Sequence, residues 1–185
     1  MQQQLDVVDP HIFDILSDIK KRDFKVIALT SGYTGKYGRI KSREDFRIHM
    51  LKGHGFDFSN SFPNIVPVIF KDIEALDPKS PPLYKSGVIF AARVSKGIVL
   101  EEFLEHAYFK PNNIIFVDNK RKNLLSVQEF CNSANIKFLG FEYLAVENRP
   151  KRPIDQNRVA MQFKILETND KWLGDEEAVQ VIYSK

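Results

Sequence analysis

Apolar residues recur along this chain in two alternating patterns, one typical of surface helices and the other of buried strands. Helical spacing of the apolar positions predicts an amphipathic helix over residues 10–22. The stripe of that helix consists of Ile12, Phe13, Leu16 and Ile19. A short, almost uninterrupted apolar run at residues 24–30 (FKVIALT) then predicts a strand that is buried on both faces.

The same alternation continues to residue 143. Further helices are predicted from Ser42 to the glycines at 53 and 55, where Ser42 and Asp45 form a capping box, and over residues 96–108 and 123–134. Strands are predicted at residues 66–70, 87–92, 113–118 and 136–143. Five prolines make the stretch from 56 to 82 irregular around its one short strand.

Strands that alternate with helices indicate an α/β fold, here a three-layer Rossmann-like parallel sheet. After residue 144 the composition changes, and the Pro- and Arg-rich run at 149–153 predicts a linker. A helix with Val159, Phe163 and Leu166 follows it. We therefore expect an α/β core over residues 1–144 and a helical extension over residues 145–185.

Composition excludes some classes of protein. The net charge of the 185 residues is only +3, too little for a nucleic-acid-binding stripe, and does not repel an anionic substrate. No run of apolar residues within the chain predicts a membrane span or a signal peptide, which leaves the location unknown. The single cysteine, Cys131, excludes an intrachain disulfide, and the four histidines lack the spacing of metal ligands.

Three residues at or near strand ends could carry chemistry, because ligands of open parallel sheets bind at the carboxyl ends of the strands. Thr30 ends one strand and is followed by Ser31 and a glycine, so its hydroxyl either donates to a phosphate or starts a turn. Asp118 ends another strand beside Asn119, which suits Mg²⁺ but also suits the capping of the next helix. Lys96 precedes that strand and could neutralise a phosphoryl group, or it is an ordinary surface lysine.

The order of these three residues resembles the second, third and fourth motifs of the haloacid dehalogenase superfamily. The similarity extends from about Val7 to Ala178 and is closest to a bacterial branch of acid-phosphatase-like proteins. It is carried by VIALTS, REDFRIHMLKGHGFDFS, SKGIVLEEFL with IIFVDN, and KWLGDEEA.

The resemblance implies a role for each matching residue. Thr30 and Ser31 would hold the phosphate, Lys96 would stabilise a phosphorylated intermediate, and Asp118 with Asn119 would help to bind Mg²⁺. Asn119 departs from the second aspartate common in that branch, and Asn123 is an alternative partner. The first motif of the family, a strand ending Asp-x-Asp-x-Thr that supplies the nucleophile, has no counterpart in this chain.

In that family the first strand lies between the strands that end here at Thr30 and Asp118. We expect those two strands to pair directly in this chain, although residues 4–8 or another chain could fill the gap. The unpaired edges would favour self-association. We also expect the natural protein to have an upstream strand with the missing motif.

The predicted function is therefore that of a Mg²⁺-dependent phosphohydrolase acting through an aspartyl-phosphate, of which this chain is an inactive C-terminal portion. Its partner would be a phosphorylated small molecule or phosphoprotein, without nucleic acid or membrane. The alternative is a non-catalytic phosphate-binding or interaction module that has lost the first motif. A receiver-like or nucleotide-binding domain is less consistent, because the chain has no paired acidic strand and no Gly-x-Gly-x-x-Gly.

Overall fold

A computed structural model describes residues 7, 9, 11–38, 40–146, 154–169 and 173–183. Tertiary contacts divide the chain into a unit of residues 7–146 and a second unit that contains the last two helices. The division falls after Val146, against the predicted boundary at 144, and the predicted linker at 149–153 lies outside the described residues. The helices are α1 (Ile12–Lys21), α2 (Arg43–Gly53), α3 (Lys96–His106), α4 (Arg121–Ser133), α5 (Gln156–Asn169) and α6 (Asp175–Tyr183). The strands are β1 (Ala28–Thr30), β2 (Val68–Ile69), β3 (Leu83–Lys85), β4 (Val88–Phe90), β5 (Asn113–Asp118) and β6 (Lys137–Glu142).

The first sheet is mixed, which corrects the prediction of a wholly parallel sheet. Its order is β1-β4-β3-β2, and only β1 and β4 are parallel. The antiparallel β3–β4 pair is a hairpin whose two-residue turn, Ser86-Gly87, has positive φ angles of 48° and 80°. Turns of this kind twist in the same sense as the strands they join. Strand β3 was not predicted, because Leu83–Lys85 directly follows prolines in a stretch that we expected to be irregular.

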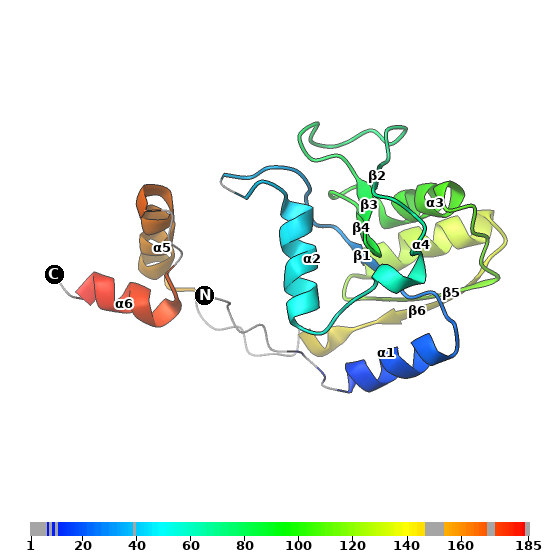
Figure 1. Ribbon diagram of the computed structural model, residues 1–185, viewed down its shortest axis with the longest axis horizontal. Coiled ribbons are helices and arrows are strands. Elements are labelled where there is room, and N and C mark those ends of the chain that lie inside the picture. Colours follow the sequence, from blue (N-terminus) through cyan, green and yellow to red (C-terminus); the bar gives the residue numbers. More distant parts are fainter. Residues whose placement is uncertain are drawn as a thin grey trace. The chain divides into compact units, whose positions relative to one another are not determined.

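Helices cover both faces of the first sheet (Figure 1). On one face, Tyr84 and Ile89 pack with residues of α3 and α4 such as Val99 and Val127, all of them fully buried. On the other face, Val88 and Phe90 pack with side chains of α2. This part of the fold is therefore an α/β sandwich of three layers.

The second sheet consists of β5 and β6, which are parallel and paired along their whole length. One of its faces packs on the shared core through Ile114, Phe116 and Phe138. The other face is exposed: Ile115 and Val117 of β5 keep 66% and 57% of their surface, and Leu139 and Phe141 of β6 keep 51% each.

Strands β1 and β5 are not paired with each other among the described residues. The expectation that they close up and pair directly was therefore wrong. The alternative in which residues 4–8 form a strand falls largely outside the described residues. The ammonium group of Lys96 donates to the Leu29 carbonyl of β1, a position that a neighbouring strand would otherwise use.

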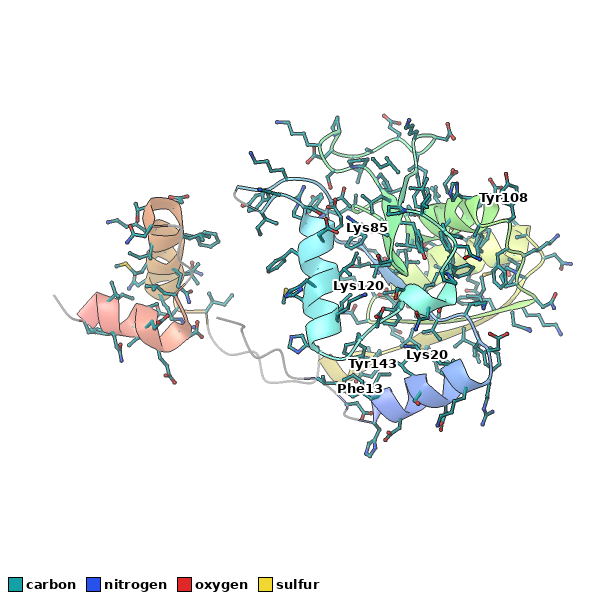
Figure 2. The ribbon with its side chains drawn as sticks, in the orientation of Figure 1. Phe13, Lys20, Lys85, Tyr108, Lys120 and Tyr143 are labelled. Atoms are coloured by element: carbon teal, nitrogen blue, oxygen red, sulfur yellow. The ribbon has the colours of Figure 1, made fainter. Side chains whose placement is uncertain are left out.

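Helix α1 lies against the α/β unit mainly through aromatic contact. The ring of Phe13, labelled in Figure 2, lies 4.9 Å from that of Phe56 and also touches Gly55. No residue of α1 is fully buried. In the second unit, the buried Gln162 of α5 donates from its amide to the Leu173 carbonyl and the Asp175 carboxylate, which joins α5 to the start of α6.

The packing of α3 on α4 depends on Gly97. A Cβ atom at this position would stand 2.1 Å from the carbonyl oxygen of Ser126, too close for any real contact. Because that oxygen belongs to the backbone of a packed helix, we expect Gly97→Ala to lower the free energy of unfolding by about 1–3 kcal/mol. Urea denaturation measures this loss. Gly32→Ala is the matched control, since its nearest neighbour would lie 3.4 Å away, and an equal loss there would contradict the explanation.

Candidate functional site

Thr30 lies at the carboxyl end of β1, where the chain leaves the sheet. Its carbonyl accepts a hydrogen bond from the Ala91 amide at 2.8 Å, and its hydroxyl accepts one from the Gly32 amide at 3.1 Å. The hydroxyl hydrogen remains available for donation to a ligand, and Ser31 beside it is exposed. The Thr30 side chain therefore both shapes the turn and offers a donor, so the two interpretations of this residue are compatible.

The edge of β1 that faces away from β4 is capped by Lys96. The main-chain groups of Ala28 and Thr30 bond toward β4, so those of Leu29 point to the opposite side. The ammonium group of Lys96 donates to the Leu29 carbonyl there, at 2.7 Å.

Lys96 also forms the one ion pair of the described chain in which both side chains are buried. Its Nζ atom lies 2.6 Å from Oδ2 of Asp118, and the two side chains keep 7% and 6% of their surface. The ammonium group also lies 5.5 Å from the centre of the Phe116 ring. Lys96 thus joins the open edge of β1 to the carboxyl end of β5.

The other oxygen of Asp118 is occupied as well. Oδ1 accepts hydrogen bonds from the Lys120 amide at 2.8 Å and from the Asn123 side chain at 2.9 Å, just before and within α4. Burial alone would raise the pKa of Asp118, but the bonds from Lys96, Asn123 and the Lys120 amide together hold the pKa below its ordinary value. The carboxylate is therefore ionised at neutral pH, and it supports the start of α4 while it pairs with Lys96.

The described residues provide only part of a magnesium site. No group of three or more acidic, histidine or cysteine side chains that could hold a metal ion occurs among them. Near Asp118 the further candidate ligands include the amide oxygens of the half-buried Asn119 and of Asn123, whose nitrogen already binds the carboxylate. Glu142 stands opposite Asp118 on β6, but its carboxylate is paired with Arg121. Mg²⁺ prefers six oxygen ligands and keeps several waters. This donor set is incomplete for the ion.

The structure brings Thr30, Lys96 and Asp118 to one region, with Ser31 and Asn119 beside them. No sequence pattern indicated the Leu29 carbonyl, because a backbone oxygen has no residue signature. It also did not indicate Arg93 or Tyr33, which follow β4 and β1. The guanidinium carbon of Arg93 lies 5.0 Å from the centre of the Tyr33 ring. The two residues are 60 positions apart in the sequence, so no local pattern predicts this contact.

A protein-family model described as "Protein of unknown function (DUF2608)" matches residues 1–179. The chain belongs to this family. No solved structure matches the chain. Membership of the DUF2608 family names no activity, so the chemistry of the site must be argued from the residues.

Curated relatives come from species of Rickettsia and Chlamydia. An "Uncharacterized protein" of Rickettsia felis is 30% identical over 133 residues, which are 70% of this chain and 45% of that protein. A second from Rickettsia prowazekii is 29% identical over 133 residues, 70% of this chain and 44% of the relative. A "Putative outer membrane protein" of Chlamydia muridarum is 40% identical over 62 residues, 34% of this chain and 24% of that protein. The chain thus spans less than half the length of these two Rickettsia relatives.

None of the helices in the described parts of the chain is both long and apolar enough to cross a membrane.

Proposed function

We propose that this chain provides the phosphate-binding and lysine–aspartate part of a haloacid-dehalogenase-type phosphohydrolase. The observation that carries the proposal is the buried Lys96, which contacts the end of β5 through Asp118 and the edge of β1 one residue before Thr30. A cation that binds phosphate needs a fixed place near the phosphate donors. The two contacts of Lys96 give it that place.

Each residue has a part in this proposal. The hydroxyl of Thr30 and the exposed Ser31 donate to the phosphoryl oxygens at the carboxyl end of β1. Lys96, held by Asp118, offsets the negative charge that develops on the phosphoryl group. Asp118 and Asn119 would supply only part of a Mg²⁺ site, which needs further oxygen ligands from outside the described residues.

The nucleophile is the missing part. In the proposed chemistry a carboxylate attacks phosphorus, the alcohol leaves, and water hydrolyses the aspartyl-phosphate. We propose that the carboxylate comes on a strand that pairs with the unpaired edges of β1 and β5, where the Lys96 ammonium now bonds to Leu29. Without that strand the same edges would favour self-association.

A specific observation favours the alternative, a phosphate-binding or interaction module without catalysis. Both oxygens of Asp118 are already hydrogen-bonded, and the carboxylate opposite it on β6, Glu142, is paired with Arg121. A site with this arrangement can bind phosphate without binding a catalytic metal tightly. Phosphoryl substrates, small or on a protein, are the partners in both proposals.

Phosphate binding and turnover in two proteins separate these functions. We expect calorimetry to detect binding of orthophosphate to this chain, with loss of binding in Thr30→Val, because the valine keeps the shape and removes the donor. The full-length Rickettsia felis relative should then hydrolyse p-nitrophenyl phosphate only with Mg²⁺. A relative that binds phosphate without turnover would favour the module. Both functions would be contradicted if orthophosphate bound to neither protein, or if Thr30→Val left its binding to this chain unchanged.

A further inference from the structure

The loop that follows β1 is strongly cationic. Residues 31–43 contain four basic residues and no acidic one. They are Lys36, Arg39, Lys41 and Arg43. The loop also carries Tyr33 and Tyr37. The loop begins directly after Thr30, the strand-end residue of the proposed phosphate site.

Buried hydrogen bonds fix the loop. Thr34 has no exposed surface; its amide donates to the Ser80 hydroxyl at 2.8 Å, and its own hydroxyl donates to the Pro81 carbonyl at 2.6 Å. Arg43 donates to the Thr34 carbonyl through two of its nitrogens. The Arg43 guanidinium is therefore held in place, and its carbon lies 5.1 Å from the centre of the Tyr33 ring.

Arg93 approaches the same ring from the segment after β4. Its guanidinium carbon lies 5.0 Å from the centre of the Tyr33 ring. This segment is hydrogen-bonded to the start of the loop that follows β1. The Ala91 amide donates to the Thr30 carbonyl, and the Ala92 amide donates to the Gly32 carbonyl. Unlike Arg43, Arg93 has neither an ion pair nor a hydrogen bond from its side chain among the described residues, and it is exposed.

The backbone that presents Arg93 is strained. Ala92 and Arg93 have φ angles of +46° and +69°, a left-handed region in which each non-glycine residue costs about 1 kcal/mol or more. This strained backbone places the Arg93 guanidinium against the Tyr33 ring, which the Arg43 guanidinium also contacts. The two positive charges repel each other. A cation–π contact at an exposed site is worth only about 0.5–1 kcal/mol. An anion bound to Arg93 would offset both costs.

We propose that Arg93, held against Tyr33, binds a second anionic group on the phosphorylated substrate. The substrate class is a phosphomonoester whose alcohol part bears a carboxylate or a second phosphate. A guanidinium suits this role because its planar fork binds such groups through two hydrogen bonds. Lys96 does not, since Asp118 and Leu29 take two of its three N–H donors and the proposed function assigns its remaining charge to the phosphoryl group. The proposal rests on the phosphate site proposed above.

The test compares two ligands that differ in one group. 3-Phosphoglycerate carries a carboxylate where glycerol 3-phosphate carries a hydroxymethyl group. By calorimetry on the whole chain, we expect the carboxylate to improve affinity about tenfold or more, the usual effect of a charge-assisted hydrogen bond. Arg93→Ala should abolish this preference without changing the affinity for glycerol 3-phosphate. Arg93→Lys should keep part of it.

Two controls make the result specific. Arg22→Ala removes the same charge at the end of α1, and should leave the preference intact. The Nε–H resonance of Arg93 in a nitrogen–proton spectrum should shift with 3-phosphoglycerate only, which tests the contact without a substitution. Equal affinities for the two ligands, both lost in Thr30→Val, would overturn the role of Arg93 and leave the phosphate site standing. Absence of binding by either ligand would overturn both.

Discussion

The purified 185-residue chain is expected to show no turnover of p-nitrophenyl phosphate in the presence of Mg²⁺. Covalent phosphoryl transfer needs a free carboxylate in line with phosphorus. Asp118 is the buried carboxylate of the site, and three donors hold it: Lys96, Asn123 and the Lys120 amide. It cannot attack without breaking the ion pair that fixes Lys96.

A release assay for p-nitrophenol measures this prediction, with Thr30→Val and Asp118→Asn as controls. A trace activity that survives unchanged in both variants would come from a contaminating phosphatase and agree with the prediction. Turnover that either substitution abolishes would contradict it, because a contaminant does not depend on residues of this chain.

The second large effect is expected on stability. Replacing Lys96 with methionine leaves the buried Asp118 carboxylate without its ammonium partner and leaves the Leu29 carbonyl without a donor. Removing one member of a buried pair costs about 3–5 kcal/mol, because the remaining charge is uncompensated. We expect Lys96→Met to lower the free energy of unfolding by that amount, as measured by urea denaturation at neutral pH.

Lys85→Met is the matched control. Lys85, labelled in Figure 2, pairs with Asp45 of α2, but these two side chains keep 30% and 54% of their surface. Exposed pairs of this kind contribute about 0–1 kcal/mol. Equal losses for the two lysines would contradict the assignment of the large effect to burial. The double variant Lys96→Met/Asp118→Asn should regain part of the loss, since no charge is then left buried.

The pH dependence gives an independent check. The pKa of Asp118 is depressed below 3.8 in the folded chain, so its contribution to stability is present above that pH and is lost as pH falls through the lowered pKa. The difference in unfolding free energy between the original chain and Lys96→Met should therefore shrink at acid pH. A difference that stays constant from neutral pH to pH 3 would show that Lys96 acts through packing alone.

Some elements follow from local sequence. Strand β5 has the predicted bounds, 113–118, because four successive residues of high strand propensity, 114–117, stand between an asparagine pair and the polar residues before a helix. Helix α2 begins after Ser42, whose hydroxyl accepts the Asp45 amide at 3.0 Å as the capping box predicts. The reciprocal hydrogen bond of the box, from the Ser42 amide to the Asp45 carboxylate, is absent among the described residues, and that carboxylate binds Lys85.

The sequence by itself determined the α/β class, the places of the main helices and strands, and the candidate residues Thr30, Lys96 and Asp118. Only the tertiary structure decided that β1 and β5 stay apart, that Lys96 bonds to Leu29 67 residues away, and that Arg93 reaches Tyr33. The physical reason is the sequence distance over which each kind of interaction acts. Helix caps and apolar periods act over a few residues, whereas strand order and buried ion pairs depend on which distant segments the core brings together.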